Sequence, residues 1–354
     1  MNISEILNCL EQQAFRPVID GFTKEPTSGE DGLDDFDNDD WRVRTLAVRD
    51  LIRLGDKSCE DIVRMLSHDS PNVRTLAATA LGILEAEQAL DALYRLLEEG
   101  ATSLDRCQAA ISIGQIGHSD SIPILKKRTS EEDQRDALSQ LSIALDQIQK
   151  HDGDQRSLKA AYFDLDEITF RSAGQNDAVS TFTLPDVDGG TWSTEQFSGK
   201  KIVLLWVFAD WCPVCHHEFH DLITFKDEFA DLGVELATVE CHDVYRSQVM
   251  AGLRPKPHYW FSDRFADLSY GKRWWPHLMD FGGAVGARFG VDPLTFAVHS
   301  EWVNRPSTIV IDENGRVEFA YHGTYWGDRP SVTELIEMLS SNTFDYEHAN
   351  RKRR

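Results

Sequence analysis

The sequence of 354 residues predicts two domains of different fold class, an N-terminal α-solenoid and a C-terminal α/β domain that carries an insertion. Three observations support this prediction. A chain of this length suits two or three domains. A helical motif recurs with a period of about 30 residues in the first half. Short β-type segments alternate with helical ones in the second half. We divide the chain into a short helix with an acidic linker (1–40), the solenoid (41–149), a connector (150–177), the α/β domain (178–345) and a basic tail (346–354).

The first 40 residues contain little that can form a core. Residues 3–16 can form a short helix, and residues 25–40 are rich in Asp, Glu and Gly with few apolar side chains. Such a composition favours a solvated acidic linker.

An internal repeat dominates residues 41–149. Residues 43–47 recur as residues 73–77, and residues 106–114 repeat the pattern of residues 74–82, including Arg-x-x-Ala-Ala and a later Gly. Second helices are expected between these copies, at 59–66, 89–97 and 122–127. The pattern resembles HEAT-like repeats of the phycobilisome-lyase type. This resemblance implies a surface for a protein partner, although the repeats can instead serve only to stabilise the second domain.

The second domain contains a Cys-x-x-Cys motif where a strand leads into a helix. The apolar segment 202–208 predicts a buried strand, Cys212-Pro213-Val214-Cys215 follows, and a helical pattern continues over residues 216–229. A helix N-terminus has unpaired N–H groups and partial positive charge, which favour a thiolate at Cys212. Cys215, one turn later, can then attack the mixed disulfide that Cys212 forms. The motif therefore predicts electron exchange between thiols and disulfides.

The remaining elements complete an α/β pattern. We expect a hairpin over residues 182–191, strands over 234–239, 307–311 and 316–320, a helix over 284–289 and a final helix over 331–339.

Four motifs of this domain occur in the order seen in thioredoxin-like redoxin domains: Phe-x-Leu-x-Asp-x-x-Gly, Phe-x-Gly-Lys, Trp-Cys-x-x-Cys and Pro-Ser-Thr-Ile-Val-Ile-Asp-x-x-Gly. The domain resembles this superfamily, which includes the alkyl hydroperoxide reductase/thiol-specific antioxidant (AhpC/TSA) family, over about residues 178–340. The resemblance implies that Cys212 attacks and Cys215 resolves. It also implies a substrate-binding surface with a cis-proline at Pro306, formed by Trp211, Pro213, Arg305 and Pro306. Arg305 can place a positive charge near the thiolate or can be an ordinary surface arginine.

Three positions depart from related families. Trp206 stands where thioredoxins commonly have a buried Asp that accepts a proton. Leu205 and Ala209 stand where peroxiredoxins have the Pro and Thr that help to hold a peroxide. We therefore expect a thiol–disulfide oxidoreductase. The alternatives are a redoxin-type peroxidase (an antioxidant enzyme) that uses the same cysteines, or a scaffold protein with a structural cysteine pair.

Other functions of these residues remain open. Cys212, Cys215, Cys241 and His242 can form a zinc ligand set, and Cys-x-x-Cys-His matches a haem attachment motif. We expect neither a metal nor another cofactor. Cys241 can also be a third redox cysteine or a small buried side chain.

Further residues near the motif also have two interpretations. His216, His217 and His220 can assist the thiolate or be solvated helix residues. The aromatic insertion at 244–275 and the extra segment at 292–304 can wall a pocket, dock onto the repeats or pack in the core.

Composition limits the partners and the compartment. The net charge of −23 argues against nucleic acid and anionic membranes as partners, since both require a basic face. The sequence contains no run of about 18 or more apolar residues, so we expect no membrane-spanning helix. The first residues show no recognisable signal peptide, and only two of the six cysteines have motif spacing. We expect a cytoplasmic protein that acts on a protein or small-molecule disulfide and binds a protein partner through the repeats.

Overall fold

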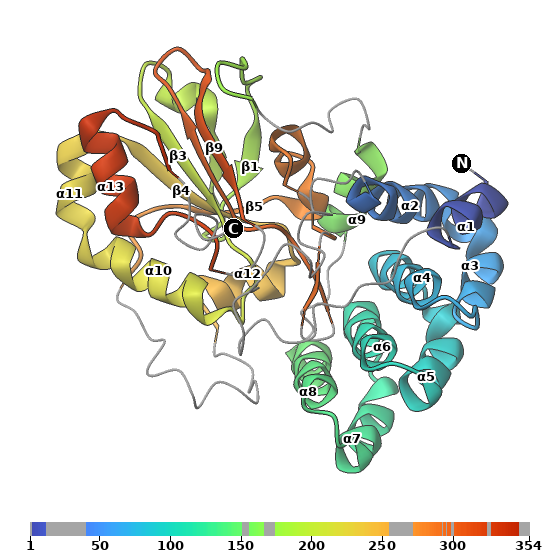
Figure 1. The fold of residues 1–354 in the computed structure, drawn as a ribbon. Coiled ribbons are helices and arrows are strands. Elements are labelled where there is room, and N and C mark those ends of the chain that lie inside the picture. The colour runs from blue at the N-terminus through green and yellow to red at the C-terminus, as the bar shows by residue number, and fades with distance from the viewer. Residues whose placement is uncertain are drawn as a thin grey trace, which may run out of the picture.

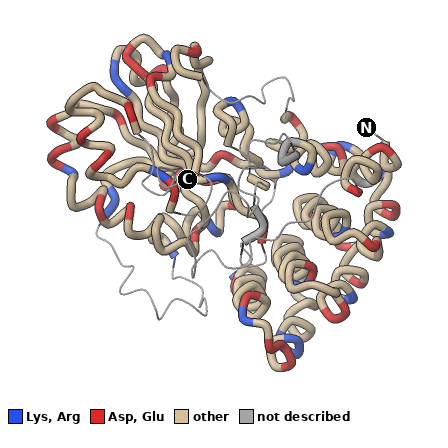
Figure 2. The backbone as a smooth tube through the Cα atoms, in the orientation of Figure 1, with Lys and Arg blue, Asp and Glu red and all other residues tan. Residues whose placement is uncertain are grey.

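The computed structural model describes residues 2–11, 40–150, 156–165, 174–254, 272–291, 293–294, 296–298, 301–323 and 327–346. Figure 1 shows a helical half beside a half built on a sheet. Among the described residues, no helix is both long and apolar enough to cross a membrane. Charged residues of both signs are spread over the helices and loops of both halves (Figure 2).

The helical half consists of helices stacked in pairs, which confirms the predicted α-solenoid. Its elements are α1 (Ile3–Glu11), α2 (Asp40–Leu54), η3 (Gly55–Ser58), α3 (Cys59–Met65), α4 (Pro71–Ile83), η4 (Glu87–Ala89), α5 (Leu90–Glu99), α6 (Ser103–Ile116), α7 (Ser121–Glu131), α8 (Arg135–Lys150) and the connector helix α9 (Arg156–Asp164). Helices α2, α4, α6 and α8 pack on one another in that order, and α9 packs on α2. Helices α3, α5 and α7 lie outside this row (Figure 1).

Small residues at repeated positions let these helices approach closely. A Cβ atom added at Gly82 would lie 2.9 Å from Ser112 Cα, and one at Gly114 would lie 2.9 Å from Ala144 Cα. These glycines occupy matching places in successive repeats, so the same requirement recurs along the row. Only a residue without a side chain permits such a close backbone approach.

A repeated arginine also links each unit to the next. Arg74 donates two hydrogen bonds to the buried carboxylate of Asp105, at 2.9 and 2.8 Å. Arg106, its counterpart one repeat later, donates to Glu132 at 3.1 Å. Paired in this way, the carboxylates can be buried without the large cost of an isolated charge.

The second half contains a five-stranded sheet in the order β5-β4-β3-β8-β9. Strand β3 pairs in parallel with β4 and antiparallel with β8, which confirms the predicted thioredoxin-like α/β fold. The strands are β1 (Thr183–Pro185), β2 (Thr191–Ser193), β3 (Ile202–Trp206), β4 (Glu235–Glu240), β5 (His277–Met279), β6 (Phe296–Val298), β7 (Glu301–Val303), β8 (Ser307–Ile311) and β9 (Val317–His322). The helices are η6 (Thr194–Phe197), α10 (Pro213–Thr224), α11 (Lys226–Leu232), α12 (Val244–Met250), η8 (Phe281–Gly283), η9 (Gly286–Phe289) and α13 (Val332–Ser341).

The central strand β3 is apolar on both faces because both faces are covered. Val203 and Leu205 belong to the core formed with α10 and α13, whereas Leu204 and Trp206 belong to the core on the opposite face, with Phe289. This continuous apolar segment matches the prediction of a buried strand. It ends at Trp206, two residues earlier than expected.

Several predicted elements differ in extent. The helix after the cysteines begins at Pro213 and is divided at Phe225 into α10 and α11. The helix expected over 284–289 is the short 3₁₀ helix η9, and strand β5 was not predicted. Residues 255–271 of the aromatic insertion and the acidic linker at 25–39 lie outside the described residues.

The described aromatics at the end of the insertion pack in the core. Trp274 donates its indole N–H to the carbonyl oxygen of Leu222 at 2.8 Å, and Trp275 donates to Thr238 at 3.0 Å. The Trp275 ring meets the ring of Phe219 edge to face at 5.2 Å. At these two tryptophans the core-packing interpretation holds.

The inner solenoid helices face the α/β domain. Gln140 of α8 donates to Glu301 of β7 at 2.7 Å, and Tyr245 of α12 donates to Asp146 of α8 at 2.7 Å. Arg44 of α2 lies 5.0 Å from the ring centre of Trp302. The chain's own second domain therefore occupies much of this inner face.

A candidate redox site at a buried cysteine pair

The two cysteines of the motif lie at the start of α10. Cys212 is the residue before the first helical position, and Pro213 occupies that first position, where its missing N–H costs no hydrogen bond. Both sulfur-bearing residues are fully buried. The N–H of Cys212 donates to the carbonyl oxygen of Ala209 at 3.0 Å, which closes the turn between β3 and α10.

Cys215 has the stronger anion-stabilising surroundings. Its Sγ accepts a hydrogen bond from the backbone N–H of Phe208 at 3.2 Å and another from Nη2 of Arg329 at 3.2 Å. Burial alone would raise the pKa of Cys215, but the hydrogen bond from Cys212 and the Arg329 charge outweigh burial and lower it. The thiolate of the resting pair is therefore best stabilised at Cys215.

Cys212 behaves in the opposite way. Burial raises the pKa of Cys212, and its hydrogen bond to Cys215 raises it further. The expectation of a thiolate at Cys212, drawn from the helix N-terminus alone, therefore differs from the structure. The reason is geometric, because the Arg329 guanidinium and the backbone N–H group of Phe208 both contact the sulfur of Cys215.

Arg329 joins Cys215 to a buried carboxyl group. Its Nε lies 3.1 Å from Oε1 of Glu218, which follows Cys215 by three residues on α10. Burial raises the pKa of Glu218 to about 7, with Arg329 lowering it and Cys215 raising it. The second oxygen, Oε2, is buried without a hydrogen-bond partner among the described residues. Cys215, Arg329 and Glu218 thus form a buried chain of ionisable groups.

Sequence reasoning missed Arg329 and Glu218. Arg329 comes from the loop between β9 and α13, and no local pattern marks it. The spacing of Glu218 from Cys215 was a usable signal, because residues three apart share a helix face. The loop is held by two tyrosines: Tyr321 donates to Asp328 at 2.5 Å, and Tyr346 donates to the Arg329 carbonyl oxygen at 3.1 Å.

The predicted substrate-binding residues are mostly enclosed. Trp211 is buried, and its indole N–H donates to a carboxylate oxygen of Glu301. Pro213 is also buried. Arg305 is buried, and Arg329, which was not predicted, donates a hydrogen bond to the sulfur of Cys215.

The prediction of a cis peptide bond before Pro306 is wrong, because the described residues contain no cis peptide bond. The backbone here is already paired within the domain. Nδ2 of Asn304 donates to the carbonyl oxygen of Arg305 at 3.1 Å, and the N–H of Gly323 donates to that of Pro306 at 2.8 Å.

The nearby histidines divide between the interior and the surface. His216 is buried, and its Nε2–H donates to the carbonyl oxygen of Asp210 at 2.7 Å, so this ring supports the turn before Cys212. His217 and His220 are exposed.

The structure does not assemble the zinc set considered from the sequence. Among the described residues, the ligand atoms of Cys212, Cys215, Cys241 and His242 form no group within 4.8 Å of one another. Cys241 belongs to the core on the opposite face of the sheet from the cysteine pair.

Comparisons with known proteins agree with this architecture. Residues 175–320 match the AhpC/TSA family, residues 33–106 match HEAT repeats, and residues 105–130 match the PBS lyase HEAT-like repeat. Two curated relatives, chloroplastic peroxiredoxin Q from Populus jackii and from Gentiana triflora, are each 24% identical over 172 residues. The alignments cover 49% of this chain and 70% and 69% of those relatives.

Two solved structures show weaker similarity. A reduced 2-Cys peroxiredoxin from Plasmodium vivax is 19% identical, with a TM-score of 0.38, over 48% of this chain and 81% of the other. Peroxidoxin BcpB from Mycobacterium tuberculosis is 21% identical, with a TM-score of 0.34, over 48% and 94%.

Proposed function

We propose that this chain is a redox enzyme of the peroxiredoxin-like class that acts as a dithiol–disulfide oxidoreductase. The match of residues 175–320 to the AhpC/TSA family, the HEAT-like repeats before them and the similarity to peroxiredoxin Q support this proposal. Cys212 and Cys215 would alternate between two thiols and one disulfide. The observation that carries the proposal is the contact between Cys215 and Arg329 at 3.2 Å beside a second cysteine one helical turn away.

The reaction uses one thiol and one thiolate. Cys212 passes its proton to Cys215 and attacks a substrate disulfide, so one Cys212–substrate bond forms and the substrate S–S bond breaks. Cys215 then loses this proton and attacks Cys212, which releases the second substrate thiol. Two electrons pass to the substrate, and one net proton is taken up. Glu218 is our candidate for accepting the proton that Cys215 loses, since Trp206 occupies the place of the thioredoxin aspartate.

A peroxidase function is the second candidate, and burial of both cysteines favours it. A hydroperoxide is small and needs less opening of the site than a disulfide does. In this reaction the Cys215 thiolate attacks the peroxide, leaves Cys215 as a sulfenic acid and releases an alcohol or water. Cys212 then condenses with the sulfenic acid to form a disulfide and water.

A redox titration tests both candidates. Thiol alkylation and mass measurement across a graded thiol buffer should give one reversible two-electron couple that is absent in Cys212→Ser and Cys215→Ser. Thiols that oxidise independently would contradict either function. Stopped-flow oxidation then separates the two: a peroxide rate no faster than that of a free thiol leaves the oxidoreductase, whereas fast peroxide oxidation without disulfide reduction selects the peroxidase.

Partner and compartment follow the same proposal. We place a protein partner on the outer helices α3, α5 and α7, because the inner helices pack against the α/β domain. We place the protein in a reducing compartment such as the cytoplasm, because only two of the six cysteines have the spacing of a redox pair.

A further inference from the structure

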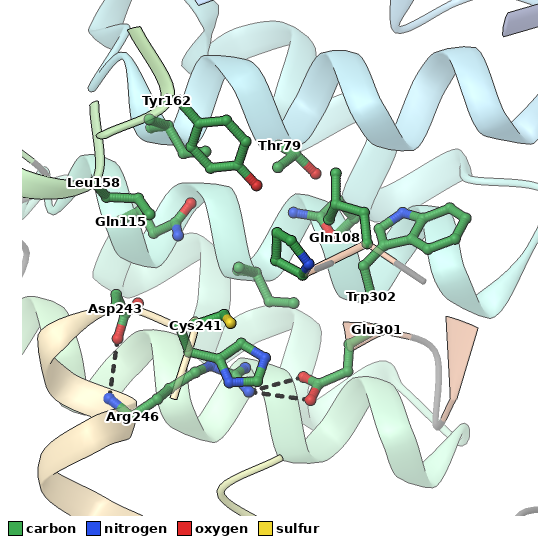
Figure 3. Close-up of a pocket in the computed structure, with 15 residues that line it drawn as sticks. Thr79, Gln108, Gln115, Leu158, Tyr162, Cys241, Asp243, Arg246, Glu301 and Trp302 are labelled. Carbon is green, nitrogen blue, oxygen red and sulfur yellow. Dashed lines mark hydrogen bonds and ion pairs between the residues drawn. The ribbon is translucent and has the colours of Figure 1, made fainter. Parts of the chain in front are cut away.

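A cavity of about 80 Å³ lies between the solenoid and the α/β domain. Figure 3 shows side chains from both halves around it, with Thr79, Gln108, Gln115 and Tyr162 on the helical side and Cys241, Asp243, Arg246 and Glu301 on the other. His242, just beyond the end of β4, also lines the cavity. Neither Cys212 nor Cys215 lines the cavity, and it plays no part in the proposed redox steps.

Three metal-ligating side chains meet beside this cavity. Asp210, Glu240 and His242 each offer one ligand atom, and these atoms all lie within 4.8 Å of one another. The carboxylates of Asp210 and Glu240 are fully buried. Separate segments supply them, because Asp210 lies in the turn after β3 whereas Glu240 ends the neighbouring strand β4.

His242 provides a second, independent observation. Its Nδ1 lies 2.8 Å from Glu240 Oε1, while its Nε2 is buried without a hydrogen-bond partner among the described residues. Buried polar atoms normally have a partner, so the ring is incomplete without a ligand or a proton acceptor. The neighbouring cavity has room for water molecules or an ion beside this ring.

The local charge also favours a cation. Three carboxylates, those of Asp210, Glu240 and Glu301, have at most 2% of their side-chain surface exposed. Arg246 contacts two of them, Asp210 at 3.0 Å and Glu301 at 2.9 Å. The third, Glu240, contacts His242 and His277, and these rings balance its charge only when protonated. A bound cation would balance it with both rings neutral, and buried charges are normally paired or bound to a metal.

We infer that Asp210, Glu240 and His242 bind a divalent transition-metal ion. Such ions bind carboxylate oxygen and imidazole nitrogen at about 2.0–2.2 Å, so two ligands of one ion are at most about 4.4 Å apart. The observed spread of up to 4.8 Å therefore requires only a small closure of the three side chains. Waters in the cavity would complete the coordination.

An outer shell for this site is already present. Nε2 of His277 lies 3.2 Å from the second oxygen of Glu240, and Nδ1 of His277 lies 2.8 Å from the hydroxyl of Thr238. Partners of this kind orient metal ligands, and their removal costs about 10–100-fold in metal affinity. The sequence prediction of no metal considered the cysteines as ligands, whereas this site contains none.

Metal binding by the full chain tests the inference. The tag-free protein is stripped with a chelator, loaded with Zn²⁺ or Mn²⁺, dialysed and analysed for metal content, and Co²⁺ is used for absorption spectra. One ion per chain is expected, with Co²⁺ bands that lack sulfur-to-cobalt charge transfer. His242→Gln and Asp210→Asn should lose the ion, and His277→Gln should bind it about 10–100-fold more weakly.

Two controls make the result decisive. His220→Gln, at an exposed histidine of α10, should retain the ion, as should the double variant Cys212→Ser/Cys215→Ser. Circular dichroism of the metal-free variants checks folding, and His242→Gln decides the matter if Asp210→Asn fails to fold, since Asp210 also pairs with Arg246. A wild-type chain without bound metal, or an ion lost only with the cysteines, would overturn the inference.

Discussion

Replacing Arg329 with Met should raise the pKa of the Cys215 thiol. The Arg329 Nη2 atom lies 3.2 Å from Cys215 Sγ, and both residues are buried, so little water screens the contact. A hydrogen bond to a charged group contributes about 1.5–3 kcal/mol. Since about 1.4 kcal/mol corresponds to one pKa unit, the expected rise is about 1–2 units.

The thiolate absorbance, followed against pH in the reduced protein, measures this change directly. At a pH below both values, the alkylation rate of the more reactive thiol should fall about 10–100-fold, because the thiolate is the nucleophile. Arg305→Met is the matched control, since it removes a buried arginine that the sequence placed near the thiolate. The Phe208 N–H contact remains in both variants. An Arg329→Met protein that titrates like wild type, or an equal shift in Arg305→Met, would refute this account.

Three further predictions concern the buried acid and the repeats. The wild-type pH–rate profile should show an ionisation near pH 7 that Glu218→Gln abolishes. Because the raised pKa means that the folded state binds the Glu218 proton more tightly than the unfolded state does, this carboxyl should also lower the free energy of unfolding as the pH rises from about 4 to about 7. Arg74→Met should cost about 3–5 kcal/mol in urea unfolding, since it strands a buried carboxylate, while Arg64→Ala at an exposed pair should cost under about 1 kcal/mol. Gly114→Ala should lower the stability by about 1–3 kcal/mol through backbone crowding. Gly190→Ala, whose new Cβ would lie 3.9 Å from Asp186 Cβ in ordinary van der Waals contact, should leave the melting temperature almost unchanged; equal effects would contradict the close-packing explanation.

The parts of the fold that could be predicted are those with a local pattern. The spacing of Arg74 and Arg106 marked successive repeats, and the continuous apolar segment before Cys212 marked a strand buried on both faces. In each case, neighbouring residues carry the physical requirement themselves.

The site was less predictable because its chemistry depends on contacts between distant segments. The position of the thiolate depends on Arg329, which is 114 residues from Cys215 in the chain. Helices α10 and α11 and strand β4 lie between Asp210 and Glu240 in the chain, and the pairing of β3 with β4 brings these two residues together. A helix N-terminus favours negative charge in general, but it does not determine which of two sulfur atoms carries that charge.

Glu301 connects the redox turn to the solenoid. It accepts hydrogen bonds from Trp211, which precedes Cys212, from Gln140 of α8 and from Arg246. Any rearrangement of the turn that accompanies disulfide formation must therefore act on the same carboxylate that holds α8. Linkage works in both directions. If disulfide formation changes the free energy of docking between the two halves, a ligand that strengthens the docking changes the free energy of disulfide formation by the same coupling. The repeats are in this sense part of the redox couple, and the reduction potential measured for the whole chain belongs to both domains together.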